Sequence, residues 1–239
     1  MTVKVDAPVV AASITSPSLQ ICDLTSRGAI EYESGLELQE QTHLRVSSGL
    51  SPSELILLEH ESIFTAGKRT ESHERPLTGA RVIDVNRGGK ITWHGPGQIV
   101  GYPIIKLGNP AELLGYVRTL EAALIAVLGH FSITGRCIKG RSGVWIDGQR
   151  KIAAIGIRVA QGVTMHGFAL NVNCDLSSYQ EIIPCGISDG SVTSMKLELG
   201  REIEVGEVLP LLKNEMNAAL SPLIALRESS TLPRRSDLL

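Results

Sequence analysis

The sequence predicts an α+β (α/β) protein, in which a mixed, largely antiparallel sheet carries packed helices. Two observations lead to this fold class. Short apolar runs bounded by turn residues recur along the chain, and three of them follow one another around the Asp147-Gly148 turn, as in antiparallel hairpins. The longer stretches with helix-spaced apolar residues stand between groups of strands. A regular alternation of strand and helix, typical of doubly wound parallel sheets, is therefore disfavoured.

The first half of the chain is expected to contain four strands and one helix. The helix covers residues 29–46, where apolar side chains recur among Glu and Gln at roughly helical spacing. The strands are apolar runs that end at turn residues, and they cover residues 19–24, 54–60, 81–85 and 98–105.

The second half contains the clearest helix of the chain, at residues 111–131. Pro110 precedes it, where a proline is favoured, and leucine and valine side chains recur on one of its faces. The other expected elements are a hairpin with strands at 143–146 and 151–159, a strand at 163–174 and an amphipathic helix at 204–220.

The predicted domain organisation is one domain, residues 19–220, between two extensions. Residues 1–18 are small, polar and proline-bearing, and residues 221–239 carry Pro222, Pro233 and an Arg-Arg-Ser-Asp cluster. We expect both extensions to be flexible.

Composition and charge exclude several classes of protein. The 239 residues, of 25.7 kDa, are 43% hydrophobic and 20% charged, as in ordinary globular proteins. The net charge of −2 provides no global basic field for nucleic acid or an anionic membrane. The four cysteines show no C-x-x-C spacing, so we expect neither a zinc site nor a disulfide framework. No signal peptide is evident and no run approaches the roughly eighteen apolar residues of a membrane span, so we expect a cytoplasmic protein.

The segment richest in candidate functional residues is RGGKITWHGPGQ, at residues 87–98. Its glycines would let backbone N–H groups approach a carbonyl or phosphate oxygen, with Arg87, Lys90 and His94 at the border. A pair of tight turns flanking a strand at residues 91–93 explains the same glycines. Composition alone does not decide between a binding loop and a pair of turns.

Cys185 and Lys151 are the candidates for nucleophilic chemistry. Cys185 lies in a Pro-Cys-Gly turn that would expose its thiol, although most free cysteines are small buried hydrophobes, as we expect for Cys22, Cys137 and Cys174. Lys151 opens a strand, where a lysine is most often solvated. If the two side chains meet, the ammonium favours the thiolate, and the neutral amine could later accept a proton from an attacking amine.

His166 opens a segment in which Asn171 and Asn173 follow in i, i+2 register, so that they share one face of a strand. The two asparagines are either polar groups satisfied at the end of the sheet or the polar rim of a site. The other histidines have no shared spacing, and we assign them no role.

Four segments, in this order, resemble the motifs of the lipoyl(octanoyl) transferase family: residues 87–98, 151–156, 166–171 and 184–187. The resemblance covers about residues 19–220 and implies a single catalytic domain with the biotin/lipoate protein ligase fold. It implies Cys185 as the catalytic nucleophile and Lys151 as the catalytic residue that tunes it. The substrate-binding residues that it implies are Arg87, Gly88, Gly89, Lys90, Ile91, Thr92, Trp93, His94, Ala154, Ile155, Gly156, Gly167, Phe168 and Ala169.

The same resemblance implies a reaction that uses no metal and no cofactor, the first step of endogenous protein lipoylation. Octanoyl passes from octanoyl-acyl carrier protein to the enzyme as a cysteine thioester. It then passes to a lysine of a lipoyl domain, in 2-oxoacid dehydrogenase complexes or in glycine cleavage H protein. An eight-carbon chain in an apolar slot contributes about 0.8 kcal/mol for each buried CH₂. We expect Gly156 and Gly167, which lack side chains, to make room for it.

Two other functions fit parts of the sequence. An ATP-dependent lipoate or biotin ligase of the same fold would activate a free acid as an adenylate and would not need the Cys185 thiol. A passive acyl-binding module would need a pocket but not Lys151 and Cys185 together. Docking of an acidic partner on a patch with Lys68, Arg69 and Arg75 is a further hypothesis, and an ordinary solvated loop is its alternative.

Overall fold

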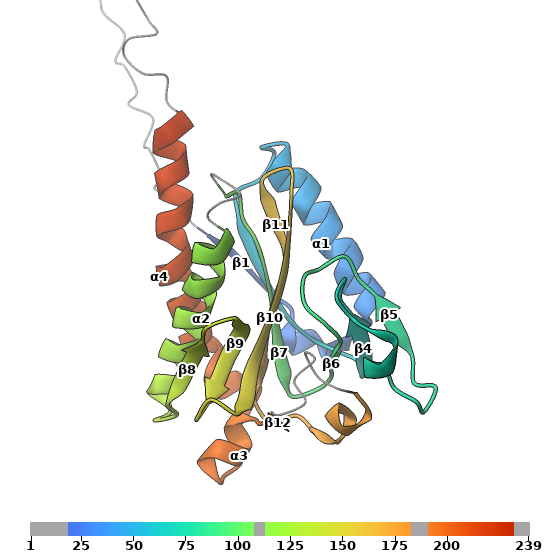
Figure 1. Cartoon of the computed structure of the whole chain (residues 1–239). Coiled ribbons are helices and arrows are strands. Elements are labelled where there is room, and N and C mark those ends of the chain that lie inside the picture. Colours follow the sequence, from blue (N-terminus) through green and yellow to red (C-terminus); the bar gives the residue numbers. More distant parts are fainter. Residues whose placement is uncertain (1–18, 108–112, 183–190, 232–239) are drawn as a thin grey trace, which may run out of the picture.

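The main sheet has the strand order β1-β3-β7-β11-β10-β9-β8, with β2 paired to β3 and β12 paired to β10 (Figure 1). The computed structural model describes residues 19–107, 113–182 and 191–231. The pairings from β3 through β7, β11, β10 and β9 to β8 are all antiparallel, whereas β1, β2 and β12 join in parallel. A second sheet of order β5-β4-β6 stands beside it. The predicted fold class, a mixed and largely antiparallel sheet with packed helices, is confirmed.

The elements have the following bounds. The strands are β1 (Gln20–Asp23), β2 (Ala29–Ile30), β3 (Glu54–His60), β4 (Ile63–Ala66), β5 (Val82–Asp84), β6 (Thr92–His94), β7 (Gln98–Ile104), β8 (Gly135–Ile138), β9 (Arg141–Ile146), β10 (Arg150–Ala160), β11 (Val163–Asn171) and β12 (Ser191–Val192). The helices are α1 (Tyr32–Ser47), α2 (Leu113–His130), α3 (Met195–Leu199) and α4 (Val205–Thr231).

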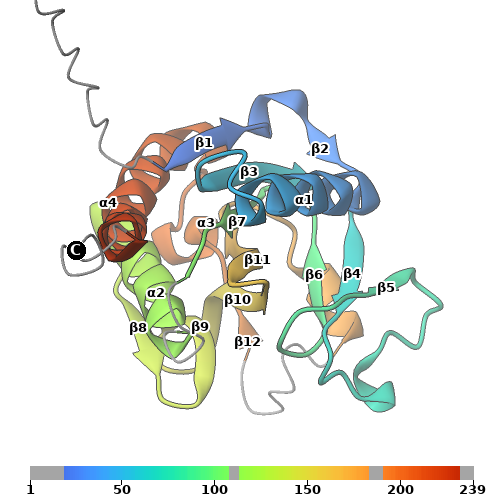
Figure 2. The same ribbon diagram turned by 90° about the horizontal axis from the view of Figure 1, so that it is seen from above.

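The helices cover both faces of the main sheet. Helices α2 and α4 pack together on one face, and α1 covers the other, where the β5-β4-β6 sheet also lies (Figures 1 and 2). The four central residues of β3 are all apolar because the strand is buried on both faces. Leu55 and Leu57 belong to the core under α2 and α4, and Ile56 and Leu58 belong to the core under α1. A strand buried on both faces reads as a continuous apolar run.

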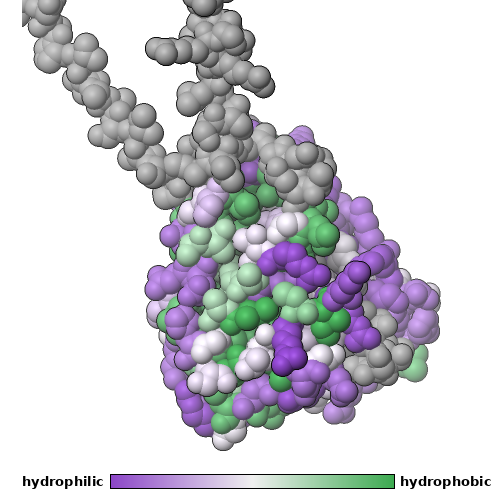
Figure 3. Space-filling model, turned by 60° about the vertical axis from the view of Figure 1, so that its left-hand side comes forward, coloured by the Kyte–Doolittle hydropathy of each residue, from purple (hydrophilic) through white to green (hydrophobic). Residues whose placement is uncertain are grey.

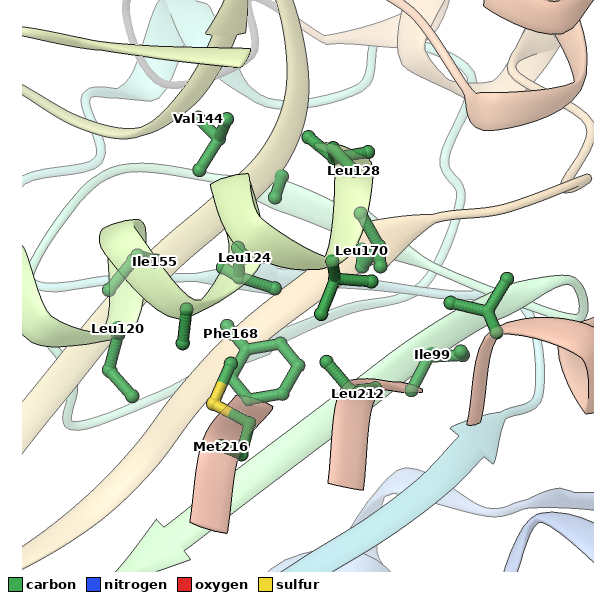
Figure 4. Packing of buried hydrophobic residues seen from close by; sticks show 14 of the residues in the cluster. Ile99, Leu120, Leu124, Leu128, Val144, Ile155, Phe168, Leu170, Leu212 and Met216 are labelled. Carbon is green, nitrogen blue, oxygen red and sulfur yellow. The ribbon is translucent and has the colours of Figure 1, made fainter. Parts of the chain in front are cut away.

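The larger core lies between the sheet and the two helices α2 and α4. Figure 4 shows Leu120 and Leu124 of α2 and Leu212 and Met216 of α4 around the ring of Phe168 from β11. These side chains are almost fully buried. Burial at about 25 cal/mol per Å² of apolar surface makes this face the main source of stability.

Helix α2 corrects one sequence expectation. Among the described residues it alone has the length and composition of a membrane-spanning helix, which the sequence was expected to lack. It packs against α4 and the sheet, with Tyr116, Leu120 and Leu124 buried. Its outer surface exposes Leu114 (69%), and on this side of the molecule hydrophobic and hydrophilic surface alternate (Figure 3).

Helix α4 is longer than predicted. The expected end at Leu220 is wrong, because the helix continues to Thr231. Pro222 suggested a stop, but it is exposed, so the carbonyl group that loses its hydrogen bond faces water. The apolar stripe also passes the proline, since Ile224 continues the spacing of Met216 and Leu220. The extent of the domain and the predicted flexibility of residues 1–18 and 232–239 stay predictions.

Five short elements, β2, β4, β8, β12 and α3, were not predicted, because they carry too few residues to show a period; residues 29–30, expected to be helical, form β2. Strand β8 also changes the expectation for Cys137, which is exposed because β8 is the edge strand of the sheet. Cys22 is half-buried and Cys174 is buried, and burial raises the pKa of the Cys174 thiol to about 12.

Candidate active site

A cavity of about 190 Å³ opens on the α1 side of the main sheet, between β10, β11 and the segment that precedes β6. Its size suits a small ligand rather than a drug-sized one. The predicted residues that line it are Arg87, Gly89, Lys90, Thr92, His94, Lys151, Ala154, Ile155, Gly156, Gly167, Phe168 and Ala169. The first, second and third resembling segments therefore meet at one place.

Lys151 lies in the wall of this cavity, on β10, and only 7% of it is exposed. Its Nζ is 4.7 Å from the centroid of the Trp145 ring, whose face attracts a cation. Within the described ranges no carboxylate forms an ion pair with Lys151. The expectation of a solvated strand end is therefore wrong for this lysine, whose backbone on β10 pairs with β12 as well as with β9.

The glycine-rich segment is folded around the Arg87 side chain. The guanidinium donates hydrogen bonds to the carbonyl oxygens of Gly88 (3.1 Å), Lys90 (2.9 Å) and Thr65 (2.8 Å). Gly89 and Gly97 have φ values of 88° and 81°, which favour glycine. The segment is thus a pair of turns around strand β6, as the alternative proposed, and the first of these turns lines the cavity through Arg87, Gly89 and Lys90.

Lys90 forms ion pairs with acidic neighbours, so its charge is not available to a ligand alone. Its ammonium pairs with Glu71 (3.2 Å) and with Glu74, a carboxylate that is almost fully buried. These hydrogen bonds raise the pKa of Lys90. The pairing fixes the cavity wall to the 3₁₀ turn at Ser72–Glu74.

His94 is neutral, and both of its ring nitrogens have a hydrogen-bond partner. Its Nδ1 is 2.7 Å from Gln98 Oε1 and its Nε2 is 3.2 Å from Thr65 Oγ1. Burial, followed by the neighbouring His60, lowers the pKa of His94 to about 3. The ring therefore presents an uncharged wall to the cavity.

A second buried histidine, His60, lies behind His94. His60 donates from Nδ1 to the carbonyl of Ile30 (2.9 Å), so its Nε2 accepts from the hydroxyl of Tyr102 (2.7 Å). Burial lowers the pKa of His60 to about 4. Tyr32 stacks near His94, with ring centroids 6.1 Å apart, and burial raises the pKa of this tyrosine to about 12.

His166 completes the polar wall from β11. Its φ of 57° is unusual for a residue with a side chain, and its backbone N–H donates to Oε1 of the buried Gln39 on α1 (2.9 Å). Burial, followed by the charges of Arg87 and Arg158, lowers the pKa of His166 to about 4. The cavity thus has neutral rings and two ammonium groups, of which that of Lys90 pairs with carboxylates and that of Lys151, set into β10, has no carboxylate partner among the described residues.

Comparison with known proteins identifies the family. The family model described as "Lipoyl protein ligase A/B catalytic domain" matches residues 31–217. The chain is 49% identical over 213 residues to an octanoyltransferase of Salinispora tropica, covering 87% of this chain and 99% of that one. It is 51% identical over 213 residues to an octanoyltransferase of Renibacterium salmoninarum, covering 87% and 91%.

The chain belongs to the lipoyl protein ligase A/B catalytic-domain family. Its curated relatives within this family are octanoyltransferases, which are acyltransferases. The fold agrees with solved members. A bi-partite lipoate protein ligase of Thermoplasma acidophilum gives a TM-score of 0.66 at 14% identity, covering 90% of this chain and 92% of that one. A lipoate-protein ligase A bound with ATP gives 0.67 at 13% identity, covering 90% and 95%.

Some of the residues that the family resemblance implied do not reach the cavity with their side chains. Ile91 and Trp93 pack with Tyr179 on the opposite side of β6, because side chains alternate along a strand. Ile155 and Phe168 line the cavity, but their side chains belong to the core under α2 (Figure 4). Gly88 does not line the cavity; its N–H donates to the carbonyl of Ile157 (2.9 Å).

Gly156 and Gly167 have a different role from the one expected in this family member. A Cβ at Gly167 would lie 2.1 Å from the Gly101 carbonyl oxygen, and a Cβ at Gly156 would lie 2.9 Å from Arg87 Cδ. Neither glycine leaves space for an acyl chain. They let β7 and the Arg87 turn come close to β11 and β10.

Several residues of the cavity wall, and His60 behind it, were not identified as candidate site residues from the sequence. Tyr102 and His60 lie in β7 and β3, both predicted strands, and a tyrosine or histidine in a strand buried on both faces needs a partner. Tyr32 comes from α1 and Arg141 from β9. Of the suggested docking patch, Arg69 lines the cavity, Lys68 is exposed and Arg75 pairs with Asp84. Cys185 lies outside the described residues.

Proposed function

We propose that this chain transfers an octanoyl group from octanoyl-acyl carrier protein, through a thioester on Cys185, to a lysine of a lipoyl domain. The observation that carries the proposal is Lys151, a buried ammonium in a cavity wall with no carboxylate partner in the described part of the chain. A buried ammonium without a counter-ion is costly, so it indicates a charge that is needed during a reaction.

The reaction has two steps. In the first, the Cys185 thiolate attacks the carbonyl carbon of the donor thioester, a new C–S bond forms, and the donor sulfur leaves with the electron pair of the old bond and takes a proton from the Lys151 ammonium, which becomes neutral. In the second, the amine of the acceptor lysine attacks the same carbonyl carbon. A C–N bond forms, the bond to Cys185 breaks, and Lys151 in its neutral form takes the amine proton. The donor thioester already holds the activation energy, so no nucleotide is needed.

The described flanks of residues 183–190 support a role for Cys185 at this cavity. Ile182 packs with Trp93 and Tyr179, next to β6, and Ser191 pairs with Arg150, the neighbour of Lys151 on β10. The two described residues that flank the segment with Cys185 therefore stand beside β6 and beside Lys151.

The other walls suit an uncharged acyl chain. Val100, Ala154 and Ala169 are apolar, and His94 is neutral. Cations stand at the same cavity in Arg69 and Arg141, where they would attract the acidic surfaces of carrier proteins and lipoyl domains. The acceptors in this proposal are lipoyl domains of 2-oxoacid dehydrogenase complexes and glycine cleavage H protein. The catalytic domain comprises residues 19–220, and the enzyme acts in the cytoplasm.

One assay separates transfer from ATP-dependent ligation and from passive binding. The protein and a lipoyl domain are mixed with octanoyl-acyl carrier protein without nucleotide, or with free octanoate, ATP and Mg²⁺. We expect octanoyl-lipoyl domain only in the first mixture. Product only in the second would establish adenylation. Binding of the octanoyl carrier protein without product would establish a passive module.

The thioester is tested separately by mass spectrometry. Incubation with octanoyl-acyl carrier protein should add one octanoyl group, which hydroxylamine removes. Cys185→Ala should abolish the adduct, and Cys174→Ala, which removes the buried thiol, is the matched control that should keep it. An adduct that persists in Cys185→Ala protein would overturn the assignment.

A further inference from the structure

Two buried side-chain amides, Gln98 and Asn171, stand behind the cavity wall without lining it. Gln98 is fully buried and Asn171 is 4% exposed. Gln98 begins β7, Asn171 ends β11, and the two residues face each other in the strand register. Gln98 Nε2 donates to Asn171 Oδ1 at 2.9 Å. A buried amide costs several kcal/mol unless it is hydrogen-bonded, so the contacts of this pair require an account.

The orientation of Gln98 follows from its neighbours. The carbonyl oxygen of Trp93 can only accept, and it lies 3.3 Å from Gln98 Nε2. Gln98 Oε1 therefore faces His94, whose Nδ1 must donate to it (2.7 Å). A neutral His94 with the proton on Nδ1 keeps a lone pair on Nε2, which accepts from the Thr65 hydroxyl. Gln98 thus selects one tautomer of a residue in the cavity wall.

The contacts of Asn171 run in the opposite direction, to the strand beside Lys151. Asn171 Nδ2 donates to the carbonyl of Thr193 (2.9 Å), and the N–H of Thr193 donates to the carbonyl of Lys151 (2.9 Å). Thr193 follows β12, which pairs with β10 at Arg150 and Lys151. The amide of Asn171 therefore holds β12 in place next to the backbone of Lys151.

A third contact of the pair involves the 3₁₀ helix at Ser177–Glu181. Gln98 Nε2 lies 3.1 Å from the hydroxyl of Tyr179, which also donates to the carbonyl of Trp93 (3.2 Å). Tyr179 and Thr193 stand on the two sides of residues 183–190 in the sequence. Through His94, Tyr179 and Thr193 the two amides thus connect β6, the 3₁₀ helix and the residue that follows β12.

We propose that Gln98 and Asn171 are positioning residues of acyl transfer, whose amides link His94 in the cavity wall to β12 beside Lys151. This inference rests on the proposed function for the reaction that is positioned, although the linkage itself is a property of the fold. The sequence had left Asn171 open as a satisfied sheet-end group or as the rim of a site. The structure confirms the first: Asn171 ends β11 with both amide atoms hydrogen-bonded, it does not line the cavity, and it is linked to Lys151 only through Thr193.

The test compares two isosteric or near-isosteric variants on one strand. Asn171→Asp replaces the Nδ2 donor by an acceptor that faces the Thr193 carbonyl. Thr164→Val is the matched control, because Thr164 is also buried on β11 and its hydroxyl donates to Pro103 O (2.6 Å) and accepts from the Ile105 N–H, away from the cavity. Both variants lose buried hydrogen bonds, so both should unfold at a lower temperature.

We expect Asn171→Asp to lower kcat for transfer at least tenfold with KM changed less than twofold, and Thr164→Val to leave both constants unchanged for the folded protein. Amide hydrogen exchange gives a readout that does not need activity. The Thr193 N–H, which donates to Lys151, should exchange at least tenfold faster in Asn171→Asp and not in Thr164→Val.

If Asn171→Asp does not fold, Tyr179→Phe carries the test, because it removes only the hydroxyl that Gln98 contacts, and we expect a threefold or larger loss of kcat. Equal losses of kcat in the variants and in Thr164→Val, or unchanged exchange at Thr193, would overturn the positioning role. Failure of the wild-type protein to transfer octanoyl would instead overturn the proposed function, while the exchange of Thr193 would still show whether Asn171 holds β12.

Discussion

The two faces of the main sheet bury different kinds of side chain. Under α2 and α4 the described core is almost entirely apolar, and Glu121 is the fully buried carboxylate there, bonded to Arg118 and to the Gly143 N–H (3.0 Å). On the α1 side the buried polar groups are His60 of β3 and Lys151 of β10, together with His94 of the second sheet and Arg87 of the turn before β6. One face is filled by leucine, isoleucine and valine, and the other encloses the cavity.

The difference shows that one face of the sheet mainly stabilises the fold, whereas the other mainly orients the groups of the cavity. Apolar burial is non-directional and stabilises in proportion to area, so it needs volume and little geometry. Buried polar groups cost desolvation and must be satisfied one by one, so they fix orientation instead. Adjacent residues of a strand point to opposite faces. Strand β7 therefore contributes Ile99 to the apolar core under α2 and α4, and Val100 and Tyr102 to the α1 side, where the cavity lies.

The strongest test of this division removes the ammonium of Lys151. We expect Lys151→Met to lower octanoyl transfer at least a thousandfold, about 4 kcal/mol of activation free energy, because both proposed steps need its charge or its proton exchange. The unfolding temperature should stay the same or rise, since a buried ammonium without a carboxylate partner opposes folding. Transfer kinetics and thermal unfolding of the same preparation measure both quantities.

Lys151→Arg is the matched variant. It keeps a positive charge but does not release a proton near neutral pH, so the acyl-enzyme should form while transfer to the acceptor lysine stalls. Near-normal turnover in Lys151→Met protein would remove this lysine from the mechanism and break the proposed division of the two faces.

On the apolar face the expectation reverses. Leu124 of α2 is fully buried in the core of Figure 4, and Leu124→Ala should lower the free energy of unfolding by about 2–5 kcal/mol. Transfer per folded molecule should change little, because Leu124 does not line the cavity. Denaturant titration and kinetics corrected for the folded fraction measure the two effects. A large loss of kcat in fully folded Leu124→Ala protein would contradict the separation.

The polar face should also make stability depend on pH. His60, His94 and His166 have pKa values of about 4, about 3 and about 4 in the folded protein, lowered by burial from 6.5. Between pH 6.5 and about 4 the unfolded chain binds more protons than the folded one, so stability is lost as pH falls through this window. Each histidine contributes up to about 1.4 kcal/mol per pH unit.

Thermal unfolding at pH 7, 6 and 5 measures this slope. The slope should decrease in a His60→Gln variant and should not change in His73→Gln, whose side chain is exposed. Asp23 and Glu74 do not account for the effect, because their pKa values are lowered from 3.8 and 4.5 and their contributions are lost at lower pH. An unfolding temperature that is flat from pH 7 to 5 would show that the histidines are not buried as neutral groups.

The elements of the apolar face could be predicted from the sequence, because the spacing of apolar residues reflects which positions are buried. The α2 stripe and the continuous run of β3 predicted their elements, the latter with its exact bounds at Glu54–His60. The predicted C-terminal end of α4 was wrong. Pro222 suggested that the helix ends before it, although an exposed proline is tolerated at this position. The burial of apolar residues on both sides of Pro222 stabilises the helix more than the proline destabilises it.

The polar face was readable only in part. The motif segments placed Lys151 and the Arg87 turn, but the partners of a buried polar group come from distant strands, and no spacing in the sequence records them. Gln98 and Asn171 lie far apart in the chain and meet only through the β7–β11 register. Gly167 shows the same limit, since its need for glycine comes from the carbonyl of Gly101 on another strand.

The smallest effect is expected on the outer surface of the apolar side. Gly115 lies in α2, is exposed, and a Cβ there would meet nothing within 4 Å. Gly115→Ala should therefore raise the free energy of unfolding by about 0.4–1 kcal/mol, because alanine restricts the unfolded chain without a clash in the helix. Transfer should be unchanged. Gly167→Ala, with its Cβ 2.1 Å from a backbone oxygen, is the opposing control and should destabilise. If Gly115→Ala slowed transfer, the α2 side would contribute to the reaction after all, and the two faces would not be separable in the way that their side chains indicate.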